Sequence, residues 1–382
     1  MVHIAVDLLQ VHSMITGAGR YSINLVKNLA KLDSCNRYTL FWPSDVFDEH
    51  KIVADNFVNV VCPAGNNRPW RIVWQQVIMP LLLKREGVDV LFSPNDITVL
   101  LAPCKTVVTI QDVRRMIWAS EFPALESWYY RVMVSLSAKK ADAILTISRT
   151  SLQDITRVLG VPANMVKVTY VGLDESFHRR ETTDAQMERA YLAHNYGIHH
   201  KYVLFVGQLR RIKNVTSLIT AFSSLRGFDG LQLVLAGAKA DAYKAICASI
   251  STLGLNGRTI LTGWVDDHDL RILYRHAEVF VFPSLYEGFG IPVIEAMASG
   301  VPVITSDVSS LAEIAGGSAL LVDPRDVGQL ADALQQVLGD GVLRQELVRA
   351  GLARASQFSW EEAARTTVET LESTACGKRG VG

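Results

Sequence analysis

The sequence predicts an α/β protein made of two doubly wound, Rossmann-like domains. The chain has 382 residues, which is more than a single hydrophobic core usually serves. Short β-branched runs alternate with longer stretches of helical period, a pattern typical of parallel sheets covered by helices. The alternation occurs as two successive series, so we expect each series to form one domain.

The expected strands follow one another along each series, and each ends in small, polar or turn residues. In the first series they are residues 3–8, 37–42, 59–63, 88–94, 105–112, 141–148 and 166–172. In the second they are residues 202–208, 231–237, 258–263, 279–284, 301–307 and 319–324. Residues 178–201, polar and poor in strand signals, are interpreted as the passage between the domains. This places an N-terminal domain at residues 1–180 and a C-terminal domain at residues 181–359.

Composition indicates a soluble globular protein, with 49% apolar and 20% charged residues. The formal net charge is zero, so charge gives no reason to expect a nucleic-acid partner. Residues 1–180 nevertheless hold 20 Lys and Arg against 16 Asp and Glu. This excess reflects either random scatter or a first domain that meets an anionic partner.

The five cysteines are scattered and form no CxxC pair, which fits a reducing compartment and no structural zinc. We recognise no secretory leader and no membrane-spanning stretch. The expected location is therefore the cytoplasm. Residues 68–85 and 127–140 mix Trp and Tyr with Lys and Arg at partly helical spacing, so two alternatives stay open for them. They are either interfacial helices at the inner face of a membrane or core helices with solvated edges.

Two glycine-containing stretches follow strands and suggest phosphate binding. Gly17 and Gly19 precede a helix, but Ser22 stands where a dinucleotide fingerprint needs its third glycine, so an ordinary turn is the alternative. In the second series, Gly207 is followed by three cations that suit a diphosphate or, alternatively, a solvated loop. These cations are Arg210, Arg211 and Lys213.

The most specific stretch is residues 283–300, where Glu287 and Glu295 are separated by seven residues. Glu287 follows an expected buried strand, and Pro292 suits the first turn of a helix. The amides of Gly288, Phe289 and Gly290 would then lie at the positive end of that helix, where an anion or a sugar hydroxyl can be held. Glu295 is also explained as an acid that favours the helix dipole.

Residues 287–296 resemble the E(x7)E signature of the retaining glycosyltransferases of family 4. The likeness covers nearly the whole chain, because further resembling segments follow in the family's order. They are residues 16–21, 141–148, 166–174, 207–214, 263–277, 300–316 and 358–364. The resemblance implies the GT-B fold, with two Rossmann-like domains facing across a cleft. It also implies a C-terminal helix, at about residues 360–375, that packs back on the first domain.

The resemblance assigns a role to each matching residue. Glu287 would bind hydroxyls of the transferred sugar, Glu295 the ribose, and Lys213 the donor diphosphate. Further donor contacts would come from Gly17, Gly19, Arg20, Gly207, Gly263, Val265, Gly288, Phe289, Gly290 and Ile291. No essential metal or cofactor is implied.

Two departures from the family pattern are visible. Gln111 stands where histidine is common, and glutamine hydrogen-bonds but does not shuttle a proton at neutral pH. Asp112 is retained, although an aspartate after a strand often serves only a turn. The arginine that the family pattern places just before Lys213 is Ile212 here, so Arg210 or Arg211 would replace it.

Asp267, His268 and Asp269 spell a DxD metal pattern, which we interpret instead as a helix cap.

We therefore expect an enzyme that transfers a hexose from a nucleotide-diphosphate sugar to a saccharide or lipid-linked acceptor. The resemblance favours GDP-mannose or a GDP-deoxyhexose as donor, in bacterial surface polysaccharide synthesis. Two alternatives stay open: a UDP-sugar-dependent transferase with a small acceptor, and a non-catalytic subunit that binds a nucleotide sugar. Gln111 is the one hint of the latter.

Overall fold

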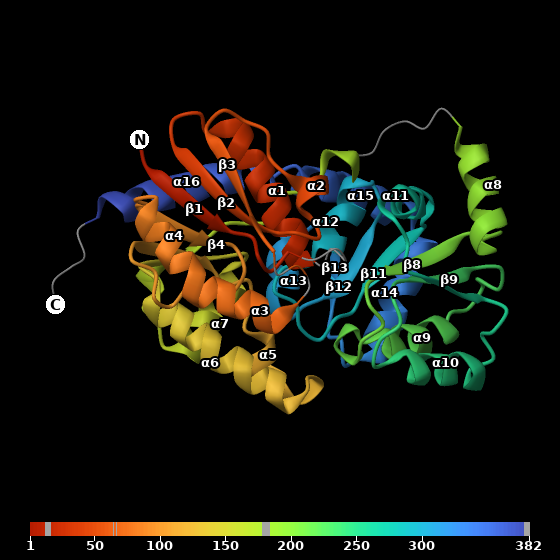
Figure 1. The fold of residues 1–382 in the computed structure, drawn as a ribbon. Coiled ribbons are helices and arrows are strands. Elements are labelled where there is room, and N and C mark those ends of the chain that lie inside the picture. The colour runs from red at the N-terminus through yellow and green to blue at the C-terminus, as the bar shows by residue number, and fades with distance from the viewer. Residues whose placement is uncertain (12–16, 64, 66, 178–183, 378–382) are drawn as a thin grey trace. The chain divides into compact units, whose positions relative to one another are not determined.

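The chain forms two compact units in the computed structural model, which describes residues 1–11, 17–63, 65, 67–177 and 184–377 (Figure 1). The first unit consists of Met1–Gly172 together with Ser359–Gly382, and the second of Leu173–Phe358. Each unit has its own parallel sheet, which confirms the predicted fold class.

The first unit contains a sheet of seven described strands, all parallel. Across the sheet they run β3 (Phe57–Cys62), β2 (Arg37–Pro43), β1 (His3–Asp7), β4 (Val90–Ser93), β5 (Lys105–Thr109), β6 (Ala143–Thr146) and β7 (Val166–Val168). The order reverses at β1, where β2 lies on one side and β4 on the other. This reversal is the topological switch point of a doubly wound sheet, where ligands usually bind beyond the carboxyl ends of the strands.

Helices cover both faces of this sheet. On one face α1 (Gly17–Leu32) contacts α16 (Trp360–Cys376), which also contacts β4, β5 and β6. The other elements of the unit are α2 (Phe47–His50), α3 (Arg68–Val73), a π-helix (Trp74–Ile78), α4 (Met79–Arg85), α5 (Arg114–Ile117), α6 (Ala124–Lys140) and α7 (Arg149–Leu159). Short 3-10 turns span Ala119–Glu121 and Ala163–Met165.

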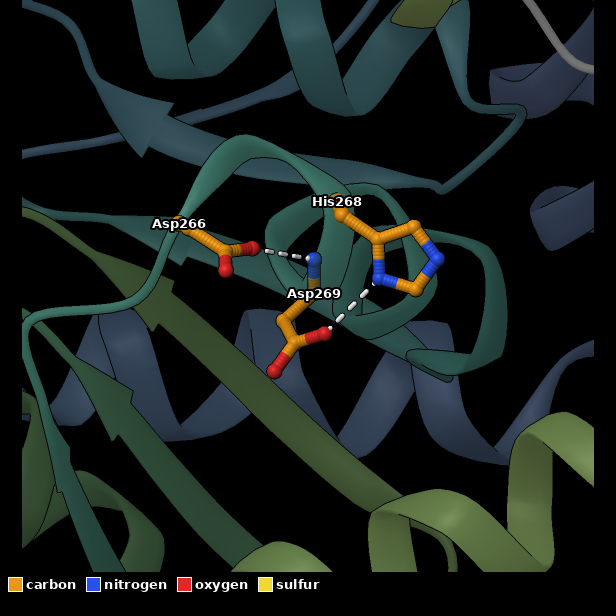
Figure 2. Close-up of side chains that lie close together, drawn as sticks. All are labelled: Asp266, His268 and Asp269. Atoms are coloured by element: carbon orange, nitrogen blue, oxygen red, sulfur yellow. Dashed lines mark hydrogen bonds and ion pairs between the residues drawn. The ribbon is translucent and has the colours of Figure 1, made fainter.

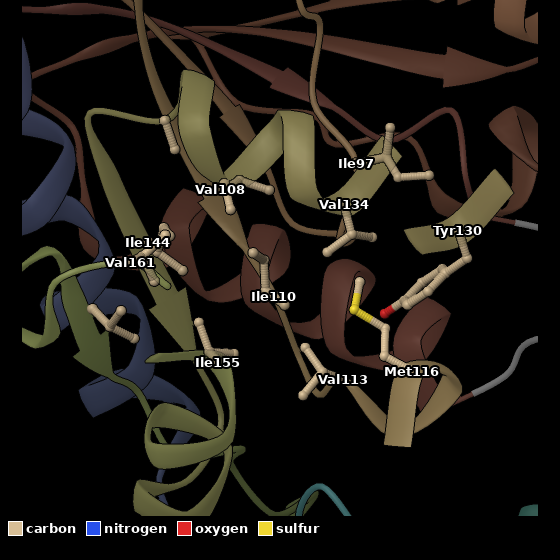
Figure 3. Close-up of a cluster of buried hydrophobic side chains, with 13 residues drawn as sticks. Ile97, Val108, Ile110, Val113, Met116, Tyr130, Val134, Ile144, Ile155 and Val161 are labelled. Carbon is tan, nitrogen blue, oxygen red and sulfur yellow. The ribbon is translucent and has the colours of Figure 1, made fainter. Parts of the chain in front are cut away.

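Two hydrophobic clusters fill the opposite face of the sheet. In one, Trp74, Met79 and Leu83 pack on residues of β1, β2 and β4. In the other, drawn in Figure 3, Tyr130 and Val134 of α6 and Ile155 of α7 pack on β5 and β6. The π-helix, α4, α6 and α7 therefore share one face of the sheet.

The second unit contains a sheet of six described strands, also parallel. Across the sheet they run β10 (Thr259–Gly263), β9 (Gln232–Ala236), β8 (Tyr202–Val206), β11 (Val279–Phe282), β12 (Val303–Ser306) and β13 (Leu320–Val322). Its helices are α8 (Ala185–Tyr196), α9 (Val215–Ser223), α10 (Tyr243–Thr252), α11 (Asp267–His276), α12 (Ile291–Ala298), α13 (Ser309–Ala315), α14 (Val327–Gly339) and α15 (Gly341–Ala355). Short 3-10 turns span Glu175–Phe177 and Arg211–Lys213.

The units divide at Gly172 and again after Phe358, whereas the sequence placed the first boundary at residue 180. A Cβ on Gly172 would lie 2.3 Å from the backbone nitrogen of Trp360, so only glycine lets the two chain segments pass this closely. Residues 184–201 are not a free connection, because α8 belongs to the second unit. Glu188 of α8 accepts hydrogen bonds from Arg275 and His276 of α11. Residues 178–183 lie outside the described part of the chain.

Helix α16 belongs to the first unit and packs on α1, where Trp360 lies 5.9 Å from the ring of Tyr21. Within the described residues, we find no helix with the length and apolar character needed to cross a bilayer.

Candidate functional site

Three glycines lie at the carboxyl ends of adjacent strands in the second unit. Gly207 follows β8, Gly237 follows β9, and Gly263 ends β10. Their backbones approach closely: the Gly207 amide donates to Ala236 at 2.8 Å, and the Gly237 amide to Gly263 at 2.8 Å. A Cβ on Gly237 would lie 1.9 Å from the Gly207 carbonyl oxygen. Sequence reasoning missed Gly237, although it ends its strand just as Gly207 and Gly263 end theirs.

Lys213 and Glu287 meet at the same edge of this sheet. Lys213 closes the 3-10 turn after β8, Glu287 follows β11, and β8 and β11 are neighbours. The Lys213 Nζ donates to Glu287 Oε1, and the two side chains are only 14% and 11% exposed. Lys213 also lies 4.9 Å from the ring centre of Phe282. The two residues that the sequence assigned to diphosphate and sugar are thus brought together as a largely buried pair.

The loops that carry this pair are joined by backbone and packing. The Leu285 amide donates to the Ile212 carbonyl at 2.8 Å, and the Ile212 side chain is buried. Ile212, where the family pattern led us to expect arginine, therefore serves as a hydrophobic anchor between the two loops.

Two serines at the start of α13 hold the glycine loop after Glu287. The Glu287 amide donates to Ser309 Oγ at 3.0 Å, and Ser310 Oγ donates to the carbonyls of Glu287 and Phe289, each at 2.9 Å. Gly290 caps α12 with a left-handed φ of 108°. Neither serine was predicted from the sequence, because nothing in their spacing shows which loop they reach.

Glu295 lies inside α12 and is 5% exposed. Its Oε2 accepts a hydrogen bond from the Tyr274 hydroxyl of α11 at 3.0 Å. Glu295 lies beyond the first turn of α12, so the explanation that it only favours the helix dipole is wrong. The Tyr274 hydroxyl instead holds the carboxylate in a defined position. Tyr274 was not singled out from the sequence, since it occupies a core position of its helix.

Arg210 and Arg211 do not join the Lys213–Glu287 pair. Arg210 Nε donates to Gln208 Oε1 at 3.0 Å, and Arg211 Nε lies 3.7 Å from Asp241 Oδ2. Both arginines line a pocket of about 470 Å³ that also includes Lys244 and to which neither Lys213 nor Glu287 belongs. The two arginines therefore have partners of their own in this structure.

Val265 lies in the connection from β10 to α11, and a group of potential metal ligands lies at the start of α11. Ligand atoms of Asp266, His268 and Asp269 lie within 4.8 Å of one another, and Figure 2 shows their arrangement. The helix cap is Asp266, whose Oδ1 accepts from the Asp269 amide at 2.9 Å. The cap predicted at residues 267–269 is thus one residue too late, because α11 begins at Asp267.

The carboxylate of Asp269 is engaged by side chains of the same unit. It accepts hydrogen bonds from Tyr191 and Tyr196 of α8 and from His268. Burial alone would raise the pKa of Asp269, but these hydrogen bonds hold it below its usual value. The contacts give the acid a structural use, which is to fasten α8 to α11.

In the first unit, Gln111 and Asp112 follow β5 at the carboxyl edge of the sheet. The Asp112 Oδ1 accepts from the Arg114 amide at 2.8 Å, as a turn residue does. The backbone amide of Gln111 donates to Asp96 Oδ1 at 3.0 Å. The side-chain amide nitrogen, Nε2, is buried and has no hydrogen-bond partner among the described residues. A buried side-chain amide at the edge of a sheet can donate a hydrogen bond to a bound ligand.

Asp96, the acceptor of the Gln111 backbone amide, was not predicted as a site residue. Its carboxylate also accepts from the Tyr130 hydroxyl at 3.1 Å, and its φ of 25° is in the left-handed region. Burial raises the pKa of Asp96 to about 6, and the charge of nearby Asp112 adds to this shift. A signal was present in the sequence, because Asp96 follows β4 just as Asp112 follows β5.

Gly17, Gly19 and Arg20 lie in the first turn of α1. A Cβ on Gly17 would meet no atom within 4 Å, so packing within the described residues does not demand glycine there. Thr16, which begins the predicted glycine stretch, lies outside the described residues.

Two family profiles match the chain, and each match lies almost entirely within one unit. The profile described as Glycosyltransferase Family 4 matches residues 15–177, and Glycosyl transferases group 1 matches residues 195–354. The chain therefore belongs to the glycosyltransferases that these two profiles describe. The predicted family membership is confirmed, and so is the predicted GT-B fold.

Sequence relatives of this glycosyltransferase include two O-antigen enzymes of similar length. The chain is 28% identical to O-antigen chain mannosyltransferase B of Escherichia coli, over 94% of the chain and 96% of that protein. It is 25% identical to O-antigen chain mannosyltransferase RfbU of Salmonella typhimurium, over 89% and 92% respectively. The serotype-specific mannosyltransferase WbdA of Escherichia coli is 28% identical over 275 residues, but the match spans only 33% of its length.

Solved structures share the fold of this glycosyltransferase. Sucrose-phosphate synthase from Thermosynechococcus elongatus superposes with a TM-score of 0.77 at 20% identity, over 97% of this chain and 98% of that one. Anabaena HepE in complex with UDP and glucose superposes with a TM-score of 0.76 at 20% identity, over 98% and 100%.

Proposed function

We propose that the protein is a retaining hexosyltransferase that uses GDP-mannose or a GDP-deoxyhexose as donor. The acceptor would be a saccharide or lipid-linked saccharide of bacterial surface polysaccharide synthesis. Two similar proteins of about the same length are named O-antigen chain mannosyltransferases, which favours this donor and this pathway. The five cysteines, all within the described residues, form no disulfide with one another, which suits work in the reducing cytoplasm.

One observation supports the site above the others: Lys213 and Glu287 are in direct contact. In a nucleotide sugar, a single anomeric C–O bond joins the sugar to the diphosphate. The groups that bind these two parts therefore have to be neighbours. A cation next to a carboxylate, both largely withdrawn from water, matches this requirement.

In the proposed mechanism, the anomeric C–O bond breaks and negative charge collects on the leaving diphosphate. Lys213 and the amides of Phe289, Gly290 and Ile291, at the start of α12, would stabilise that charge. Glu287 would hold sugar hydroxyls while the ring becomes oxocarbenium-like. The acceptor oxygen would attack on the face that the diphosphate leaves, and a phosphate oxygen would take the acceptor's proton.

The remaining donor contacts follow from the edge of the second sheet. Glu295, oriented by Tyr274, would accept from the ribose hydroxyls. Gly207 would let the diphosphate approach the backbone, and residues 263–265 would receive the base. In the first unit, the side-chain amide of Gln111, whose Nε2 has no hydrogen-bond partner among the described residues, would donate to a ligand hydroxyl. No step requires a metal or cofactor.

A UDP-sugar donor with a small acceptor is the second candidate, because HepE, which shares this fold, is described with UDP and glucose. Thermal-shift titration of the purified protein with GDP-mannose, GDP-deoxyhexoses and UDP-glucose distinguishes the two, since the cognate donor stabilises by mass action. Nucleotide release with and without acceptor then tests catalysis. Binding without any release would contradict the enzyme assignment and support a non-catalytic subunit.

A further inference from the structure

A line of apolar side chains faces solvent along the segment from α3 to α4. Trp70 and Val73 are each 44% exposed, Val77 is 59% exposed and Leu81 is 66% exposed. The opposite side of the same segment is buried against the sheet through Trp74, Met79 and Leu83. A helix that only covers a sheet normally turns polar residues to water, so this segment is apolar on both sides.

The neighbouring helix α6 continues this exposed apolar area. Leu125 is 76% exposed and Trp128 is 63% exposed. Arg68, at the start of α3, stacks over Tyr129 of α6 at 5.4 Å from the ring centre. Figure 1 shows α3, α4 and α6 side by side on one face of the first unit. The exposed side chains of the two helices therefore belong to one region of the surface.

Cations border these apolar residues. The chain contains no acidic residue between Asp55 and Glu86, and the cations in this interval include Arg68, Lys84 and Arg85. Lys84 is exposed, while Arg85 forms a surface pair with Glu86. Helix α6 adds Arg131 and Lys139, both exposed, and one half-buried acid, Glu126. We name the whole area the basic–aromatic surface: Trp70, Val73, Val77, Leu81, Leu125 and Trp128, with Arg68, Lys84, Arg85, Arg131 and Lys139.

We propose that the basic–aromatic surface binds a lipid bilayer that contains anionic lipids, with α3, α4 and α6 lying in the interface. Tryptophan favours the headgroup level, aliphatic side chains enter the acyl boundary, and each lysine or arginine gains from anionic headgroups. The charge decides the occupant, because a second copy of this chain would bring the same cations against one another. This inference goes beyond the proposed function, since the surface would bind lipid whether or not sugar is transferred.

Vesicle flotation of the full chain tests the proposal. The probes are vesicles of phosphatidylcholine alone and vesicles of equal parts phosphatidylcholine and phosphatidylglycerol. We expect binding to the anionic vesicles that weakens with salt, because the surface charges are screened. The triple variant Trp70→Gln, Val77→Gln, Trp128→Gln should lose binding more than tenfold, and the charge variant Lys84→Glu, Lys139→Glu likewise.

A matched control removes exposed apolar side chains elsewhere. Met187 and Val342, in the second unit, are 67% and 68% exposed, and Met187→Gln with Val342→Gln should leave flotation unchanged. Equal thermal melting and equal donor binding in solution show that each variant is folded. No flotation of the wild type, or full flotation of the triple variant, overturns the proposal. Light scattering that shows a dimer lost in the triple variant also overturns it, in favour of an interface between copies.

Discussion

Lys213 and Glu287 form an ion pair between two loops that follow neighbouring parallel strands, β8 and β11. Because both side chains are largely buried, removing one partner leaves the other charge without compensation. We expect Lys213→Ala and Glu287→Ala to lower kcat at least about 100-fold, as loss of a preorganised charge does, while the protein stays folded. Each single variant should also lose about 3 kcal/mol of unfolding free energy.

The double variant Lys213→Met, Glu287→Gln separates the two effects. It removes both charges and keeps the volume, so most of the lost stability should return while activity stays absent. Urea unfolding and nucleotide release measure the two quantities. Near-normal transfer in any of these variants would mean that the site is elsewhere.

Tyr274 orients Glu295, and its hydroxyl can be removed without loss of its ring packing against Phe177 and Phe280. Tyr274→Phe should raise the KM for the donor about fivefold to tenfold and leave kcat nearly unchanged, because the ribose does not change in the reaction. Tyr202→Phe is the matched control, since its buried hydroxyl donates to the Leu273 carbonyl at 2.7 Å instead. Equal changes in KM for both variants would contradict the proposal that the Tyr274 hydroxyl acts on donor binding by orienting Glu295.

Gly290 has a left-handed φ of 108°, and a Cβ there would lie 2.7 Å from Leu311 Cδ2. Gly290→Ala should cost about 1–2 kcal/mol from the backbone alone and shift the loop that carries Glu287. Adding Leu311→Ala relieves the contact but not the backbone strain, so activity should return only in part. The melting temperature should fall further, because Leu311 is fully buried and its truncation opens a cavity. Gly257→Ala is the control, because its Cβ would meet no atom within 4 Å. Melting temperature and nucleotide release report both effects.

The Asp96 carboxylate accepts a hydrogen bond from the backbone amide of Gln111, and Asp96 itself has a left-handed backbone conformation. Asparagine tolerates that conformation and keeps an acceptor, so Asp96→Asn should retain stability and most of the kcat. Asp96→Ala leaves the amide of Gln111 without its acceptor and should cost about 1–3 kcal/mol, with a lower kcat. Urea unfolding and saturation kinetics of both variants check this. If the two variants behave alike, the hydrogen bond to Gln111 is not what Asp96 provides.

Asp7 ends β1 and is 3% exposed, and burial raises its pKa to about 6 in spite of the hydrogen bonds from Gln75 and Leu9. The unfolded value is about 4, so the folded state binds the proton more tightly. The stability that this group contributes is therefore greatest below about pH 4 and is lost as the pH rises through 6.

Asp7→Asn should remove this pH dependence. Relative to the wild type, the variant should gain about 2–3 kcal/mol of unfolding free energy between about pH 4 and pH 7. Urea unfolding at several pH values measures the difference, in which the contribution of Asp96 cancels. A constant difference across this range would contradict the raised pKa of Asp7.

Much of the site was predictable because its residues follow strands in the sequence. The carboxyl ends of parallel strands meet at one edge, so the order of strands and loops is enough to assign Gly207, Lys213, Gly263 and Glu287 to one place. The glycine loop and Pro292 likewise predicted the start of α12. These are local signals, which nearby residues are sufficient to produce.

Other features depend on contacts between distant segments. Ser309, Tyr274 and Asp96 form hydrogen bonds to Glu287, Glu295 and Gln111, and spacing along the chain does not reveal which side chains will meet. The same holds for Arg210 and Arg211, which resembled phosphate ligands but contact Gln208 and Asp241.

By itself, then, the sequence determined the two parallel α/β sheets, the glycine loop and the positions of Lys213 and Glu287 beyond the ends of their strands. The tertiary structure alone decided which side chains hold these groups in place and which apolar residues of α3, α4 and α6 remain exposed. The physical reason is that hydrophobic period and turn chemistry are local, whereas hydrogen-bond partners and burial are set by the packing of segments far apart in the chain.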